Sequence, residues 1–167
     1  SQREIAGHLQ RGIQALDLLG RKVLMKDGAA LKILLGEVTA TVKTAASTGL
    51  PEEAQALQAA IGALSTALQA VGAASDANRS LANATLFLNS FGHVVIAWLW
   101  LKQALLAERA LAGGASDGAE GTFYRGKLGA CRYFFRYELP KVHAELALVA
   151  SLDTTCLDFG GEDFGEV

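Results

Sequence analysis

Histidine side chains are the first groups to consider, because an imidazole can bind a metal or carry a proton near neutral pH. The chain has three of them, His8, His93 and His143. No second metal-type ligand lies at helical spacing from His93, and the two cysteines, Cys131 and Cys156, do not form a CxxC pair. We therefore predict no metal site. His93 is either a functional ligand or proton carrier, or a core histidine that hydrogen-bonds to a facing helix.

Three arginines form a second group of chemical interest. Arg125, Arg132 and Arg136 fall on the face of the last long segment that is opposite its apolar stripe. Such a row could bind a phosphate-rich ligand, or it could be a solvated face with acidic partners. The sequence holds no GxGxxG, P-loop, HExxH or GxSxG motif. Neither a phosphate-cradling loop nor a hydrolase triad is therefore indicated.

Five amphipathic segments must position these side chains. Their apolar residues recur at spacings of three and four, the pattern of helices that pack side by side. The five stripes are Leu9, Ile13, Leu16, Gly20 and Val23; Leu31, Leu35, Val38, Val42 and Ala45; Leu57, Ile61, Leu64, Leu68 and Val71; Phe87, Phe91, Val94, Trp98, Leu101 and Leu105; and Tyr124, Leu128, Cys131, Phe135, Leu139, Val142, Leu146 and Val149. No segment alternates with period two, so we predict no sheet.

Turn signals separate the segments. Gly49 suits the residue after a helix and Pro51 suits the first turn of the next helix. A capping residue is predicted within 75–78, and the glycine-rich stretch 113–118 is predicted to be a loop. Short connections of this kind make neighbouring helices antiparallel.

These elements predict an all-α fold. We expect an up-down-up-down four-helix bundle over residues 27–150, preceded by an additional N-terminal helix over 1–26. Residues 151–167 are glycine-rich and acidic, and we expect an irregular C-terminal tail there.

Several residues inside the helical segments carry their own predictions. Pro140 is expected to bend the last helix, because it lacks a backbone donor. Gly92 and Gly129 each cost a helix ~1 kcal/mol, which suggests close approach of a neighbouring helix. Trp98 and Trp100 lie about 200° apart around a helix, so one could point outward to another domain or subunit. The alternative is that flanking helices cover both.

Composition excludes some classes of protein. A formal net charge of −2 argues against a nucleic-acid surface. The apolar run 86–101 is interrupted by polar residues and falls short of the ~20 residues that a membrane span needs, so we predict a buried core helix. Two unpaired cysteines favour a reduced, cytoplasmic setting.

Several motifs resemble the acyl-CoA dehydrogenase family, in the branch with an extended C-terminal helical domain. The segment GIQALDLLGRKV resembles the residues that follow the catalytic Tyr-Glu-Gly-Thr motif of that family. The motifs that resemble its C-terminal domain are FGHVV at 91–95 with Trp98, FYRGK at 123–127, RYF at 132–134 and LP at 139–140. The matches keep their order along nearly the whole chain, so the chain resembles the C-terminal portion of a larger enzyme.

The resemblance implies a parent enzyme that takes a proton from an acyl-CoA substrate with a glutamate base and passes a hydride to FAD. His8 occupies the position of that glutamate, and nothing else of the motif survives around it, so no catalytic residue is assigned. Gly12, Ile13 and Gln14 are the candidate FAD-proximal residues. The catalytic domains would lie upstream, so we expect this chain to bind no FAD alone. Its expected role is structural, against those domains or another subunit of a homo-oligomer.

Two other functions stay open. One is a stand-alone helical protein-interaction module without catalytic activity, which docks through Trp100 or an exposed apolar groove. The other is a cofactor-binding bundle with His93 or His143 as ligands. That reading fits the fold but lacks the carboxylate-plus-histidine spacing of di-metal bundles.

Overall fold

The chain is described here by a computed structural model. Its described residues are 29–76, 78–79, 82–115 and 117–158. Throughout these ranges the chain forms helices, turns and loops, and no strand occurs in them. The predicted all-α class is therefore confirmed, while the predicted helix over 1–26 lies outside the described residues.

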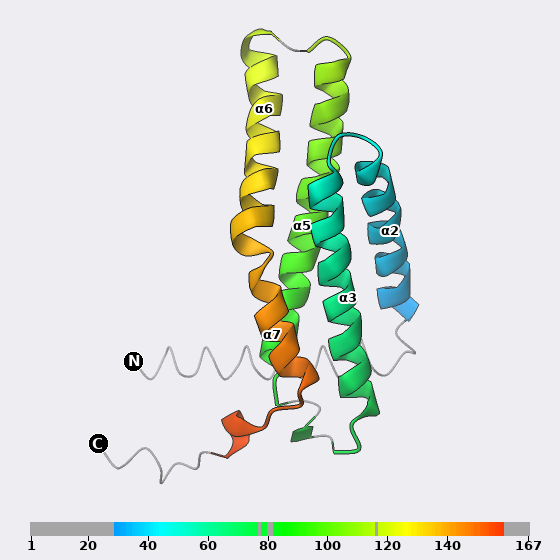
Figure 1. Ribbon diagram of the computed structural model, residues 1–167, viewed down its shortest axis with the longest axis vertical. Helices are drawn as coiled ribbons and strands as arrows, with labels where there is room; N and C mark the ends of the chain where they lie inside the picture. The colour runs from blue at the N-terminus through cyan, green and yellow to red at the C-terminus, as the bar shows by residue number, and fades with distance from the viewer. Residues whose placement is uncertain (1–28, 77, 80–81, 116, 159–167) are drawn as a thin grey trace, which may run out of the picture.

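Long helices arranged around a shared core make up the described bundle (Figure 1). They are α2 (Ala29–Ala46), α3 (Pro51–Ala73), α5 (Ala84–Ala112), α6 (Gly118–Tyr133) and α7 (Lys141–Ala150). A π-helical segment, η2 (Phe134–Glu138), joins α6 to α7, and a short 3-10 helix, η3 (Thr155–Leu157), follows. In Figure 1 the chain reverses direction between α2 and α3 and again between α5 and α6.

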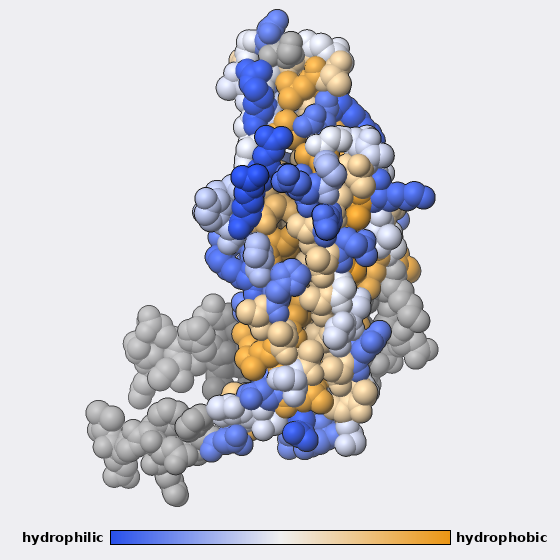
Figure 2. Space-filling view, viewed as in Figure 1, coloured by the Kyte–Doolittle hydropathy of each residue, from blue (hydrophilic) through white to orange (hydrophobic). Residues whose placement is uncertain are grey.

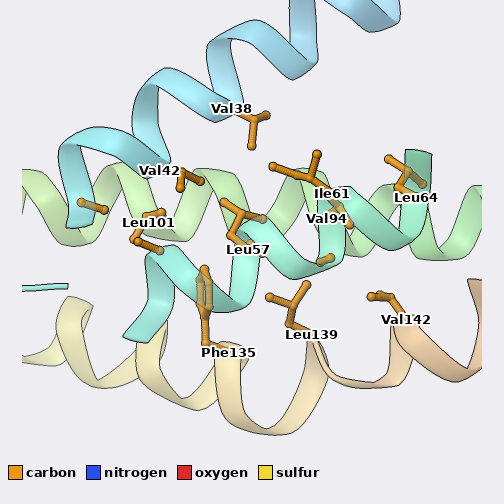
Figure 3. Close-up of a cluster of buried hydrophobic side chains, with 14 of the residues drawn as sticks. Val38, Val42, Leu57, Ile61, Leu64, Val94, Leu101, Phe135, Leu139 and Val142 are labelled. Atoms are coloured by element: carbon orange, nitrogen blue, oxygen red, sulfur yellow. The ribbon is translucent and has the colours of Figure 1, made fainter. Parts of the chain in front are cut away.

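The predicted apolar stripes of the described helices form one core. Figure 3 shows side chains from α2, α3, α5 and the α6–α7 region converging there. The labelled members are Val38, Val42, Leu57, Ile61, Leu64, Val94, Leu101, Phe135, Leu139 and Val142, and all are buried. Burying one such aliphatic side chain stabilises the fold by ~1.5–3 kcal/mol. Because this gain is repeated at each apolar residue of a stripe, the stripe determines which face of its helix packs against the core.

The α2–α3 turn follows the sequence signals. Gly49 has φ +88°, a left-handed conformation that suits glycine at the end of a helix. Pro51 is the first residue of α3, where its missing N–H costs nothing. Glu52 and Glu53 lie in the first turn, at the positive end of the helix dipole. The predictions for Gly49 and Pro51 are confirmed.

The predicted cap within 75–78 is wrong for α5. The N-cap position of α5 is Asn83, and its side-chain amide donates a hydrogen bond of 2.8 Å to the backbone carbonyl of Asp153. Asp76 instead accepts from the backbone N–H of Asn78 at 2.9 Å, in a turn that precedes α5. The sequence did not reveal that residues after α7 return to the start of α5.

Pro140 disturbs the last helix as predicted. A proline cannot donate to the carbonyl four residues earlier, so the α-helical pattern cannot pass through it. The backbone widens just before it, where the N–H of Leu139 donates to the carbonyl of Phe134, five residues back, at 2.9 Å. The result is the π-helical η2 between α6 and α7.

The close helix approach predicted at Gly92 and Gly129 is wrong. A Cβ atom placed on either glycine would meet no heavy atom within 4 Å outside its own helical neighbourhood. Gly129 is exposed and Gly92 is half-buried. No neighbouring helix in the described part of the chain uses the space that these glycines leave.

Gly129→Ala should therefore stabilise the isolated chain by about 1 kcal/mol, because alanine restricts the unfolded backbone and favours helix. Urea unfolding followed by circular dichroism measures the change. Gly49→Ala is the control and should destabilise the chain, because its φ of +88° strains an L-residue. A destabilising effect of Gly129→Ala would show that a contact outside the described residues needs the glycine.

The helices α3 and α5 are long and apolar enough to cross a membrane when judged by length and composition alone. Core helices of globular domains pass the same test. The apolar run 86–101 falls within α5, and there Phe87, Val94 and Leu101 are buried in the bundle core as predicted. The outer face of α5 is exposed, and its residues are considered below.

Candidate functional site

A groove between α2 and α5 is the first candidate site. Its volume is about 310 Å³. It is lined by Glu37, Ala40, Thr41 and Thr44 of α2 and by Lys102, Leu105, Leu106 and Arg109 of α5. Neither Lys102 nor Arg109 has a carboxylate within 4 Å among the described residues, and Glu37 is the acidic residue of the lining. The groove therefore carries an excess of positive charge.

Trp98 fixes the two walls of this groove. Its indole Nε1 donates a hydrogen bond of 2.8 Å to Oγ1 of Thr41, which ties α5 to α2. The Thr41 hydroxyl in turn donates to the backbone carbonyl of Glu37 at 3.0 Å. The ammonium group of Lys102 lies 4.9 Å from the centroid of the Trp98 ring, within range of a cation–π contact. These contacts place the Lys102 ammonium group beside Trp98, in the lining of the groove.

Thr41→Val should lower the free energy of unfolding by about 1 kcal/mol, because it keeps the side-chain shape and leaves the Trp98 N–H without its acceptor. Thr39→Val is the matched control, since Thr39 is exposed and bonds only to the backbone of its own helix. Urea unfolding of both variants tests the difference. Equal effects of the two substitutions would contradict the role of the Trp98 contact.

Trp98 and Trp100 both pack against the bundle core as half-buried side chains. The ammonium group of Lys127, from α6, lies 5.6 Å from the Trp100 ring centroid. The structure therefore favours the interpretation in which flanking helices cover both tryptophans. Trp100 is therefore not an outward anchor, and the interaction-module alternative would depend on an exposed apolar groove.

A second groove, of about 430 Å³, lies between the start of α3 and the end of α6. Its lining residues are Gly49, Pro51, Glu52, Glu53, Arg132 and Arg136. Nε of Arg132 lies 3.9 Å from Oε1 of Glu53, and Nη2 of Arg136 lies 3.8 Å from Oε2 of Glu52. Figure 2 shows hydrophilic side chains gathered over α6.

The arginine row is therefore a charged face on which Arg132 and Arg136 have acidic partners. Arg132 and Arg136 face carboxylates across the groove, and Arg125 donates to the Thr122 hydroxyl of its own helix at 3.3 Å. A phosphate entering this groove would meet two carboxylates as well as two guanidinium groups. The structure therefore favours the interpretation of these arginines as a solvated face with acidic partners over their interpretation as a phosphate site.

His93 lies at the junction of α5 with η2. Its side chain is 35% exposed, Nδ1 is 3.0 Å from the carbonyl oxygen of Asn89, and Nε2 is 3.9 Å from Oε2 of Glu138. Lys141 donates to the same Glu138 oxygen at 2.8 Å, and this hydrogen bond holds the pKa of Glu138 below its usual value. The interpretation of His93 as a core histidine that hydrogen-bonds to a facing helix is therefore wrong, because its ring is partly exposed and its hydrogen bond goes to its own helix.

No metal-ligand set is visible in the part of the chain that the structure describes. Within those ranges, no three His, Cys, Asp or Glu side chains come close enough together to hold an ion. His143 is exposed on α7, and Cys131 is buried in the core. The arrangement offers no support for a cofactor bound through His93 or His143.

The predicted FAD-proximal residues cannot be placed. Gly12, Ile13 and Gln14, together with His8 at the position of the family glutamate, lie outside the described residues. The two described grooves do not fit a flavin dinucleotide, since both are open surface grooves whose linings include charged side chains, rather than enclosed apolar clefts. No catalytic step can be derived from the described bundle.

The α2–α5 groove was missed by sequence reasoning. Lys102 and Arg109 are seven residues apart on α5, and Thr41 and Thr44 are three apart on α2, so each pair shares a helix face. From the sequence alone, each pair could be recognised as polar residues on one face of an otherwise apolar helix. The sequence did not show that these two faces lie against each other.

Comparison with known proteins matches most of the described bundle to one family. Residues 34–160 match the family model described as acetyl-CoA dehydrogenase C-terminal like. A butyryl-CoA dehydrogenase of Syntrophomonas wolfei is 29% identical over 154 residues, which cover 91% of this chain and 25% of that protein. The broad-specificity linear acyl-CoA dehydrogenase FadE5 of Mycobacterium tuberculosis is 31% identical over 155 residues, which cover 87% of this chain and 25% of that protein. The chain therefore spans about a quarter of the length of these relatives.

Proposed function

Since the chain belongs to the acetyl-CoA dehydrogenase C-terminal-like family, we propose that it is the C-terminal helical domain of an FAD-dependent acyl-CoA dehydrogenase. The observation that carries the proposal is the family match over residues 34–160, which takes in all of the long helices apart from the start of α2. Both relatives are acyl-CoA dehydrogenases by name and about four times as long as the matched region.

The parent enzyme would dehydrogenate the α and β carbons of a linear acyl-CoA thioester. The relatives' names, butyryl-CoA dehydrogenase and linear acyl-CoA dehydrogenase, support this substrate class. FAD would take up the hydride, in the catalytic domains upstream of this chain. The described bundle supports a structural role, because its interior is filled by apolar side chains and the arginines of its second groove pair with carboxylates.

The proposed setting is the cytoplasm, and the proposed assembly is a homo-oligomer. The two cysteines of the chain, Cys131 and Cys156, are free thiols, which suits a reduced compartment. Within the oligomer, this domain would lie against the catalytic domains of its own chain or of another subunit.

Purification of the protein together with the sequence encoded upstream of Ser1 tests this function. We expect bound flavin, seen by its absorbance, and oxidation of butyryl-CoA with an artificial electron acceptor. The 167-residue chain alone is the control and should carry no flavin. A flavin-free product without dehydrogenase activity would contradict the proposal and would leave the stand-alone interaction module as the better reading.

A further inference from the structure

The outer face of α5 is unusually apolar for an exposed surface. Ile96, Leu99 and Leu106, which we call the α5 stripe, are 44%, 46% and 62% exposed. Their spacings of three and seven place them on one side of the helix, away from the buried Ala97 and Leu101. On α2, the helix across the groove, Ile33 is 69% exposed.

A comparison with α3 shows that this face is not simply the outside of a core helix. The exposed face of α3 carries Gln55, Gln58 and Gln69. The exposed face of α5 carries large aliphatic side chains beside the polar Lys102 and Gln103. Large aliphatic side chains on the outer side of a helix, in addition to those in the core, are typical of a helix that is covered on that side too. The helix α5 contacts α2, α3, α6 and α7, and the stripe stays exposed beside those contacts.

We propose that the α5 stripe, with the neighbouring α2–α5 groove, seats the catalytic domains of the parent enzyme. This inference rests on the proposed function. The partner is then a protein surface that presents an apolar ridge edged by carboxylates. The ridge would cover Leu99 and Leu106, and the carboxylates would pair with Lys102 and Arg109, which have no described carboxylate within 4 Å.

The length of the relatives supports this occupant. The chain matches only a quarter of each relative, and the family model describes a C-terminal region, so about three-quarters of such a protein precedes this domain. That upstream part would reach the described bundle by way of residues 1–28 and then α2, which begins at Ala29 and forms one wall of the groove. The first described helix after the upstream part is thus one that borders the groove.

Polar residues within the same face argue for a protein rather than a lipid partner. Gln103 lies between Leu99 and Leu106 along the helix, and its side-chain oxygen accepts a hydrogen bond of 3.0 Å from Lys127. Burying these polar groups in hydrocarbon would be costly, whereas a protein surface can supply partners for them.

Hydroxyl-radical footprinting of leucine side chains tests the proposal. The 167-residue chain and the whole enzyme are labelled in parallel, and mass spectrometry reads Leu99 and Leu106. We expect strong labelling in the isolated chain and loss of labelling in the whole enzyme. Leu148 of α7, which is 42% exposed, is the internal control and should label equally in both.

Three outcomes would overturn the proposal. Equal labelling of Leu99 and Leu106 in the two samples would show that the catalytic domains do not cover the stripe. Protection in the isolated chain that rises with its concentration would assign the stripe to a second copy. Protection of the isolated chain by phosphatidylglycerol vesicles would assign it to a lipid surface.

The double variant Leu99→Asp with Leu106→Asp provides an independent readout in the whole enzyme. It should speed release of this domain by limited proteolysis, whereas Leu148→Asp should not. Unchanged proteolysis would overturn the proposal. Flavin content and butyryl-CoA oxidation report separately on the proposed function, so a whole enzyme with flavin but a labelled stripe would refute only the docking face.

Discussion

Replacing Leu101 with alanine is expected to lower the free energy of unfolding by about 3 kcal/mol. Leu101 is 0% exposed in the middle of α5, so truncation removes buried apolar surface and leaves a cavity that the tightly packed helices cannot fill. Urea or thermal unfolding of the 167-residue chain measures the loss.

Leu99→Ala is the matched control on the same helix. Leu99 is 46% exposed, and its substitution should cost less than about 0.5 kcal/mol in the isolated chain. Comparable losses at the two positions would mean that α5 is rotated relative to the described core. In the whole enzyme, the cost at Leu99 should rise if the α5 stripe is covered by the catalytic domains.

The two cysteines should differ greatly in reactivity. Burial, followed by the nearby Glu53 carboxylate, raises the pKa of the Cys131 thiol to about 12 from an ordinary value of 9.0. A shift of this size lowers the thiolate fraction at neutral pH about a thousandfold. Since the thiolate is the nucleophile, iodoacetamide at pH 8 should modify the exposed Cys156 quickly and leave Cys131 unmodified.

Mass spectrometry of the native chain, with a urea-unfolded sample as the control, tests this difference. Both cysteines should react after unfolding. Rapid modification of Cys131 in the native chain would contradict its burial between α3 and α6.

The same pKa predicts an alkaline loss of stability. Between pH 9.0 and about 12, the unfolded chain has released the Cys131 proton, while the folded chain still holds it. The free energy of unfolding therefore falls as the pH rises through this window, by at most about 1.4 kcal/mol per pH unit, and this contribution is intact below pH 9.0. Unfolding curves of Cys131→Ala should show a shallower alkaline decline than those of the unmodified chain.

Much of the fold follows from local sequence. The stripes at Val38 and Val42, at Leu57, Ile61 and Leu64, and at Phe135 to Val149 were all recognised from spacing, and they form the observed core. Gly49 and Pro51 ended and began helices as their backbone chemistry requires. The family resemblance rested on motifs within the same helices, and the match over residues 34–160 confirms it.

The candidate sites were harder to predict, because each depends on contacts between distant segments. Trp98 meets Thr41 across 57 residues, and Asn83 meets the carbonyl of Asp153 across 70. In the core, the 0% exposed Ser90 donates to the Glu145 carboxyl group at 2.6 Å, across 55 residues. The spacing of residues within one helix does not predict which residue of another segment will be the hydrogen-bond partner. The errors at Gly92 and Gly129 have the same origin, since a glycine shows that space is free but not whether a neighbour fills it.

The sequence by itself determined the helices of this protein and their inward faces, because a period of 3.6 residues makes every apolar stripe a local property. Only the tertiary structure decided how the helices are rotated and shifted against one another. That relative placement brings Lys102, Arg109 and Glu37 into one groove and leaves Ile96, Leu99 and Leu106 bare. The physical reason is that apolar burial is non-directional: it requires a buried face but does not select which polar side chains meet across it.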